Sequence, residues 1–371
     1  MHRGIAIRLT AVAIGLFFGV MLLEAVARFV LTDYFICDDR LGWVFEPEQS
    51  GFRINRRYEY AIRARINSAG FHDVEHEIAK PAGTVRLVLL GDSMLAGMQV
   101  PLDNVFARRL ANRLNADGDG RFGVINCATD GYGTAQAWLM FDERCARYDP
   151  DVVVLGVYYY NDFLDNYHAG GSTNHPLAYR CGRPYFSVED TGLTPTVGVA
   201  ERATLSLGER IDRVLRFSYL YQVLVPYYDK GLGRAFKNKD VYRVEYPADV
   251  SKAWGITKQL LLAVDAAVRS QEAKLVVMLI PSRWEIYTSW GAADWGSAEG
   301  LDIDRPSTLL REFLDENGIV YFDLRPAFKA YVSGGAEPLF FRHDPHWTQS
   351  GNELAATAYA TWFRNNHYTS R

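Results

Sequence analysis

Two short polar segments, far apart in the sequence, contain residue types that could act together in nucleophilic catalysis. The first is Gly91-Asp92-Ser93-Met94, which directly follows the apolar run 85–90. Because such a run is typical of a buried parallel strand, Ser93 is expected just past the carboxyl end of a central strand, where open α/β sheets bind ligands. Ser93 is therefore a candidate nucleophile. The alternative is that it caps the helix that follows.

The second segment lies near the carboxyl terminus and reads His343-Asp344-Pro345-His346-Trp347. A turn of this kind can place Asp344 against one ring nitrogen of His346 and leave the other nitrogen facing Ser93. His346 would then take the serine proton and return it to the leaving group. Two alternatives remain open. Asp344 could cap the following helix while His346 packs beneath the sheet, or His343 and His346 could bind a metal, for which no third ligand is evident.

Nucleophilic attack on an ester produces an oxyanion, and two further positions could supply hydrogen-bond donors to it. Gly131 follows the predicted strand 123–127, and Asn161 follows the predicted strand 151–158. A glycine lets the backbone N–H approach a substrate closely, and the amide of Asn161 can donate from another side. Taken singly, Gly131 is more often a turn glycine and Asn161 a turn or capping residue.

The order of these segments resembles the four blocks of the SGNH (GDSL-like) hydrolase superfamily: G-D-S, then Gly131, then Asn161-Asp162, then D-x-H near the carboxyl terminus. The likeness extends from about residue 85 to the carboxyl terminus, without a long central insertion. Two departures stand out, since Tyr160 replaces the family's usual glycine and the first block reads G-D-S-M instead of G-D-S-L-S. Neither departure removes a reacting group.

This resemblance implies a flavodoxin-like three-layer α/β/α sandwich with a central, mostly parallel sheet, and ester-bond chemistry that needs no cofactor and no metal. It implies Ser93 as nucleophile, His346 as base and Asp344 as its partner. Gly131, Asn161 and the backbone N–H of Ser93 would form the oxyanion hole. The amino-terminal anchor and the D-P-H-W segment also resemble exported members related to polysaccharide O-acetyl transfer and deacetylation.

The hydrophobic pattern itself predicts a parallel α/β sheet, because short apolar runs alternate with segments of helical period. The alternation stops over an insertion at about 165–250, which is rich in aromatic residues and contains a predicted amphipathic helix at 205–228. Strands are predicted at 85–90, 123–127, 151–158, 274–281 and 319–324. Helices are predicted at 104–115, 134–147, 252–271, 307–317 and from about 350.

The amino terminus carries a membrane-insertion signal, because residues 11–23 have no charged side chain and follow Arg3 and Arg8. Extended to Leu31, the segment is long enough to span a bilayer and would place the rest of the chain outside the cytoplasm. The competing interpretation is a signal peptide cleaved after 25–27 (AVA). The predicted division is an anchor at 1–32, a strand-rich lead-in at 33–84 and a hydrolase domain at 85–371.

The composition of the chain argues against two classes of function, nucleic-acid binding and cysteine-based metal binding. The formal net charge of −4 over 371 residues gives no basic footprint for nucleic acid. The four cysteines, Cys37, Cys127, Cys145 and Cys181, show no metal spacing and leave disulfides or free thiols open.

The primary hypothesis is a serine esterase of the inner membrane, with its catalytic domain on the periplasmic side, that acts on an acylated small molecule or glycan. The alternatives are an O-acyltransferase on the same triad, a catalytically silent module that binds a glycan or protein, and a metallohydrolase. The sequence identifies no protein partner.

Overall fold

Five parallel strands form the central sheet of the protein. The computed structural model describes residues 2–30, 32–55, 57–116, 121–167, 181–189, 192–198, 218, 238–290, 299–335 and 337–366. The sheet has the order β11-β10-β7-β5-β6, and every neighbouring pair is parallel. Its strands are β5 (Val85–Leu90), β6 (Phe122–Asn126), β7 (Val152–Val157), β10 (Lys274–Leu279) and β11 (Val320–Asp323). This is the flavodoxin-like strand order. The chain adds β6 on one side of β5 and then β7, β10 and β11 on the other, so the order switches between β5 and β7.

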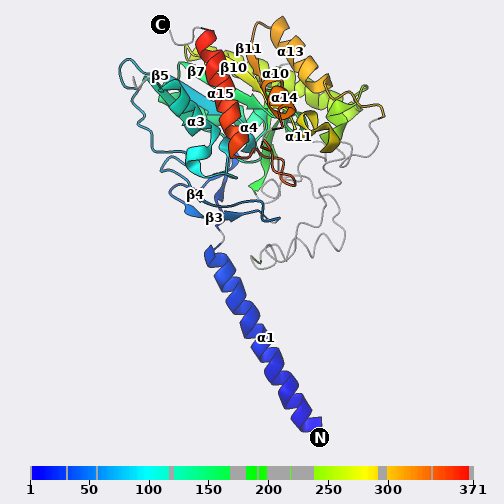
Figure 1. The fold of residues 1–371 in the computed structure, drawn as a ribbon. Helices are drawn as coiled ribbons and strands as arrows, with labels where there is room; N and C mark the ends of the chain where they lie inside the picture. Colours follow the sequence, from blue (N-terminus) through cyan, green and yellow to red (C-terminus); the bar gives the residue numbers. More distant parts are fainter. Residues whose placement is uncertain are drawn as a thin grey trace.

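Helices cover both faces of this sheet and complete the predicted three-layer sandwich (Figure 1). On one side α15 packs on α3, and on the other α10 packs against α4 and, through Trp254 and Phe313, against α13. The long helices are α3 (Phe106–Leu114), α4 (Thr134–Met140), α10 (Ala248–Ser270), α13 (Arg305–Glu316), α14 (Arg325–Ser333) and α15 (Gln349–Asn365). Their amphipathic faces and the all-buried strands β5 and β7 together form the core.

The predicted elements lie where expected, with two differences. The helix predicted at 134–147 is α-helical only to Met140 and continues as a π-helical turn, η2 (Phe141–Cys145), and the short 3-10 helix η3 (Ala146–Tyr148). Helix α14 was not predicted, because its nine residues follow β11 without a loop long enough to mark a new element.

The lead-in folds as two antiparallel strand pairs that pack on the sandwich. They are β1 (Phe35–Asp38) with β2 (Gly42–Phe45), and β3 (Ser50–Ile54) with β4 (Ala61–Arg65). Trp43 of β2 is fully buried, its indole N–H donates to the carbonyl of Asp130 at 2.9 Å, and its own carbonyl accepts from the Tyr132 hydroxyl at 2.6 Å. The lead-in thus shares one hydrophobic core with the sheet.

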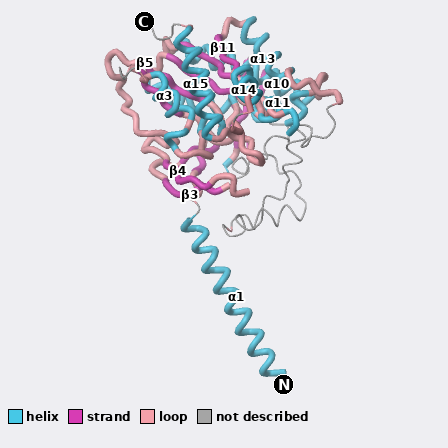
Figure 2. The backbone as a smooth tube through the Cα atoms, viewed as in Figure 1, coloured by secondary structure: helices cyan, strands magenta, loops and turns pink. Residues whose placement is uncertain are grey.

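Helix α1 (His2–Val30) leaves the domain from the side on which β3 and β4 lie (Figures 1 and 2). Its segment Ile7–Arg28 is long and apolar enough to cross a membrane, and none of it is buried against the rest of the protein. A signal sequence near the amino terminus would satisfy the same criterion.

All four cysteines are paired, as Cys37–Cys181 and Cys127–Cys145. The first disulfide joins β1 to the start of the predicted insertion. Of that insertion the structure describes β8 (Arg183–Glu189), β9 (Gly192–Gly198), which pairs with it, and the short 3-10 helix η4 (Lys239–Tyr242). The helix predicted at 205–228 lies outside the described residues, apart from Ser218.

Candidate active site

Ser93 begins the short helix α2 (Ser93–Ala96), immediately beyond the carboxyl end of β5. The turn between them depends on Gly91, whose φ of +148° disfavours a side chain and whose Cβ, if present, would lie 3.0 Å from the carbonyl oxygen of Gly156. The helix cap is Asp92, whose carboxylate accepts from the Met94 N–H at 2.9 Å. The alternative role for Ser93 as an N-cap is therefore wrong, and its hydroxyl is available for another partner.

That partner is His346, although 253 positions separate the two residues in the sequence. The Nε2 atom of His346 lies 2.7 Å from the Ser93 Oγ. On the other side of the ring, Nδ1 makes a short hydrogen bond with Oδ1 of Asp344. Asp344 does not cap α15, because the cap of that helix is Thr348. The structure thus brings together the three residues predicted as a triad.

The electrostatic environment couples the imidazole to the carboxylate. Burial alone would raise the pKa of Asp344, but attraction to His346 and the hydrogen bonds from its ring and backbone lower that pKa to about 2. Burial alone would lower the pKa of His346, but the carboxylate of Asp344 outweighs it and raises the pKa above its usual value. A base with this partner holds a proton more firmly than free imidazole.

The second oxygen of Asp344 is held by residues that the sequence did not indicate. Asn55 Nδ2 donates to Asp344 Oδ2 at 3.0 Å, and the Tyr60 hydroxyl donates to the same oxygen at 3.3 Å. Both belong to the connection between β3 and β4. Residues 50–65, here called the lead-in hairpin, therefore form one wall of the site. The polar sequence of residues 50–65 contains no pattern that predicts contact with Asp344, which lies nearly 290 positions further along the chain.

Further contacts fix the lead-in hairpin against the loop that carries Asp344. The backbone N–H of His343 donates to Glu59 Oε1 at 2.9 Å, and the rings of Tyr60 and Phe341 lie 5.1 Å apart. On the other side, Arg53 forms a 2.7 Å ion pair with Asp130, the residue before Gly131. The lead-in hairpin thus contacts both the Asp344 loop and the loop after β6.

Gly131 and Asn161 stand at the carboxyl ends of the strands on either side of β5. Gly131 has φ +78°, a conformation that favours glycine, and its carbonyl accepts from Arg183 at 2.8 Å. Asn161 precedes the short helix α5 (Asp162–Asp165), and its Nδ2 donates to Asp165 Oδ2 at 2.7 Å. A longer contact of 3.4 Å joins the same Nδ2 to Asp162 Oδ1, so both carboxyl groups orient the Asn161 side chain. Their role as oxyanion donors stays a prediction.

Buried carboxyl groups surround the turn that carries Ser93. Desolvation raises the pKa of Asp92 to about 7, and it raises that of Asp162 well above its usual range, aided by repulsion from Asp92. The Asp162 carboxyl also accepts from the Tyr158 N–H at 3.0 Å, which closes the turn after β7. These groups hold backbone turns in place, and their burial favours the protonated forms.

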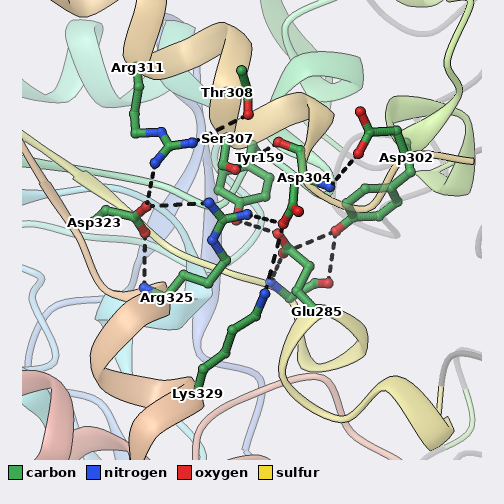
Figure 3. A network of polar contacts seen from close by, with 12 residues as sticks. Tyr159, Glu285, Asp302, Asp304, Ser307, Thr308, Arg311, Asp323, Arg325 and Lys329 are labelled. Atoms are coloured by element: carbon green, nitrogen blue, oxygen red, sulfur yellow. Dashed lines mark hydrogen bonds and ion pairs between the residues drawn. The ribbon is translucent and has the colours of Figure 1, made fainter.

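A second polar network ties together the ends of β7, β10 and β11 (Figure 3). Glu285, from the short helix α11 (Arg283–Ile286), accepts from the Tyr159 hydroxyl at 2.6 Å and from the Ser282 N–H at 2.6 Å. Burial raises the pKa of Glu285 to about 7. Beside it, Arg325 pairs with Asp304 at 2.6 Å. We interpret this network as structural support for the loop after β7 that carries Asn161.

The metal alternative gains no support from the part of the chain that the structure describes. Within it, no group of three or more His, Cys, Asp or Glu side chains is placed to hold a metal ion. His343 contacts the lead-in hairpin through its backbone, and both ring nitrogens of His346 are engaged by Asp344 and Ser93.

Residues 244–371 match the family model described as "SGNH hydrolase-like domain, acetyltransferase AlgX". The matched span contains Asp344 and His346, and the sheet places Ser93 beside them. Residues 244–371 therefore resemble an SGNH hydrolase-like domain. The resemblance to SGNH hydrolases and the predicted flavodoxin-like fold are both confirmed.

Several solved structures are similar to this protein. One is an acetyl xylan esterase, AlAXEase, with 17% identity and a TM-score of 0.41 over 76% of this chain and 99% of that chain. A lipase/acylhydrolase from Enterococcus faecalis has 12% identity and a TM-score of 0.42 over 78% and 100%. TesA has 13% identity and a TM-score of 0.40 over 76% and 98%. No curated protein matches the chain.

The coupling between His346 and Asp344 predicts a measurable titration. We expect the His346 imidazole to titrate above the usual histidine pKa of about 6.5, because Asp344 stabilises its charged form. In Asp344→Asn, burial remains without the carboxylate, and the pKa should fall below that value. NMR titration of the ring nitrogens measures both. An unchanged pKa in Asp344→Asn would contradict the coupling.

Proposed function

We propose that the protein is a serine esterase that removes acyl groups from an acylated carbohydrate or a similar substrate of the cell envelope. The observation that carries this proposal is the continuous hydrogen-bonded chain from Ser93 through His346 to Asp344, with 2.7 Å between Ser93 Oγ and His346 Nε2. A serine hydroxyl, an imidazole and a carboxylate in this order are the parts of an activated nucleophile.

In the first half of the reaction, Ser93 Oγ attacks the ester carbonyl while His346 Nε2 takes the hydroxyl proton. The imidazolium that forms is stabilised by the neighbouring Asp344 carboxylate. Collapse of the tetrahedral intermediate breaks the bond to the alcohol. His346 returns its proton to the departing alcohol oxygen, and the acyl group remains on Ser93.

The negative charge on the former carbonyl oxygen needs donors at the same edge of the sheet. The proposed donors are the backbone N–H groups of Ser93 and Gly131 and the side-chain amide of Asn161. Support comes from their positions after three adjacent strands and from Asp165, which orients Asn161. Each such donor is worth about 3 kcal/mol of transition-state stabilisation.

The second half of the reaction releases the acyl group. Water, deprotonated by His346, attacks the acyl-enzyme, and the proton then returns to Ser93 Oγ. The products are a carboxylic acid and the free enzyme. If a sugar hydroxyl attacks in place of water, the same atoms perform O-acyl transfer. This is the second candidate function, and it is favoured by the word acetyltransferase in the description of the matched family model.

We further propose that α1 anchors the protein in the inner membrane with the catalytic domain on the periplasmic side. Arg3 and Arg8 precede the apolar segment, which favours a cytoplasmic amino terminus. The two disulfides support an oxidising compartment for the domain. An uncleaved α1 should appear in the intact mass of the purified protein.

Labelling with a fluorophosphonate, which reacts with activated serines, tests the proposed nucleophile in the full-length chain. We expect the wild type to be labelled, and Ser93→Ala and His346→Ala to lose labelling, because one removes the nucleophile and the other its base. Ser350→Ala, an exchange on the surface of α15, is the matched control and should label normally. A folded wild type that is not labelled would favour the silent binding module.

Asn55 provides a test of how the triad is positioned. We expect Asn55→Ala to lower kcat about tenfold with little change in KM, because Asp344 loses a donor that fixes its orientation. Asn55→Asp should be worse, because it places a second carboxylate against Asp344. Glu316→Ala, an exchange at an exposed position of α13, is the control. Equal rates for Asn55→Ala and the wild type would show that the other contacts of Asp344 suffice.

A further inference from the structure

The lead-in hairpin has two faces of different character. Along β4 the residues alternate between exposed and buried, so that Ile62 and Ala64 face the domain while Arg63 and Arg65 face outward. Strand β3 adds Phe52 opposite Arg63 and Ser50 opposite Arg65 on the outer face. The inner face belongs to the site already described, but the outer face has no role in it.

The outer face combines cations with exposed aromatic rings. Phe52 is 49% exposed, and Tyr58, in the turn of the hairpin, is 72% exposed. Arg57, Arg63 and Arg65 are exposed beside them. Aromatic rings with arginines are the residue types that anchor proteins at the interface between a membrane and water.

The charge of this segment differs from that of the whole chain. Residues 48–65 contain five arginines and two glutamates, whereas the complete chain has a net charge of −4. A hollow of about 500 Å³ on the outer face is lined by Glu48, Ser50, Arg63 and Arg65. Glu75 lies close enough to attract Arg65. The balance nevertheless favours an anionic partner, because arginine forms strong paired hydrogen bonds with phosphate.

The position of the hairpin relative to α1 indicates which anionic partner it meets. The membrane-length segment ends at Arg28, and Thr32 already packs on the lead-in hairpin, its Oγ1 occupying the space where a Cβ on Gly51 would lie. Four residues of extended chain span at most about 14 Å. The polar headgroup layer is about 5–8 Å deep on each side, and electrostatic attraction extends about 8 Å beyond a charged surface in physiological salt.

We propose that the outer face of the lead-in hairpin binds the anionic headgroups of the bilayer in which α1 is anchored. This inference depends on the proposed anchoring and not on the proposed reaction. Figure 1 shows β3 and β4 between α1 and the sandwich, on the side from which the anchor leaves. Because Asn55 and Tyr60 of the same hairpin hold Asp344, binding in this way sets the catalytic edge of the sheet against the membrane surface. The substrate is then taken up at that surface.

The test uses the full-length protein in nanodiscs of phosphatidylcholine alone or with phosphatidylglycerol, each containing a lipid with a nitroxide quencher on its headgroup. A bimane fluorophore on Tyr58→Cys reports contact of the hairpin with lipid. A fluorophore on Gln271→Cys, an exposed position beyond α10 at the opposite edge of the sheet, is the control. We expect strong quenching at position 58 only in the anionic discs, and none at position 271 in either.

Charge reversal then tests the arginines. Each arginine near an anionic surface contributes about fivefold to binding, so Arg63→Glu with Arg65→Glu should return quenching at position 58 to the level of neutral discs. Arg147→Glu with Arg269→Glu, exposed cations at the opposite edge, should leave quenching unchanged. Fluorophosphonate labelling and thermal unfolding check that the variants fold.

Salt gives a readout that needs no charge variant. For the otherwise unchanged protein, quenching at position 58 in anionic discs should fall as salt screens the attraction. Quenching that is equal in neutral and anionic discs, or insensitive to both salt and charge reversal, would overturn the proposal. It would leave the outer face to a partner other than lipid, without affecting the proposed chemistry at Ser93.

Discussion

The site depends on the convergence of parallel strands at one edge of the sheet. β5, β6 and β7 are neighbours and run in the same direction, so the segments that follow them emerge side by side. The side on which successive strands are added switches between β5 and β7. In open α/β sheets, ligands bind at such a switch point, beyond the carboxyl ends of the strands. Ser93 directly follows β5 at this point, and the loop before α15 brings His346 Nε2 to within 2.7 Å of its hydroxyl. A distorted β5 would move Ser93 away from His346.

Charge balance is the second constraint on this edge of the sheet. Asp92, Asp130, Asp162 and Asp344 all lie at the candidate site, and ionised carboxylates in a buried site would repel one another. The structure meets this constraint in three ways: Asp92 and Asp162 have raised pKa values, Arg53 pairs with Asp130, and Asp344 shares its charge with His346. The Asp344 carboxylate, whose pKa is lowered, lies directly against the imidazole of His346.

The lead-in hairpin connects this chemistry to the amino-terminal helix. Its inner residues reach Asp344 and Asp130, and its first strand lies against Thr32, just after α1. Residues of the sandwich alone therefore do not complete the candidate site. The same hairpin presents arginines and aromatic rings outward, so the proposed contact with the membrane and the orientation of the Asp344 carboxylate depend on one structural element.

The sequence predicted the five strands and the triad residues because these follow from local patterns. An apolar run such as 152–157 is expected to form a buried strand. A G-D-S segment directly after such a run is therefore expected at the carboxyl end of a strand. The role of Asn55 and Tyr60 could not be predicted in this way. Their contacts with Asp344 depend on how a polar hairpin docks on a distant loop, and such docking leaves no periodic signal. The pairing of Cys37 with Cys181 was open for the same reason.

In the proposed mechanism the Oγ atom of Ser93 carries the acyl group. Direct detection of this acyl-enzyme is the sharpest test of the mechanism. The full-length protein would be incubated with an activated acetyl ester, quenched in acid and analysed by peptide mass spectrometry. We predict one added acetyl group on the peptide that contains Ser93, and none in His346→Ala treated in the same way. Acetylation of another residue, or equal acetylation in the absence of His346, would contradict the proposed mechanism.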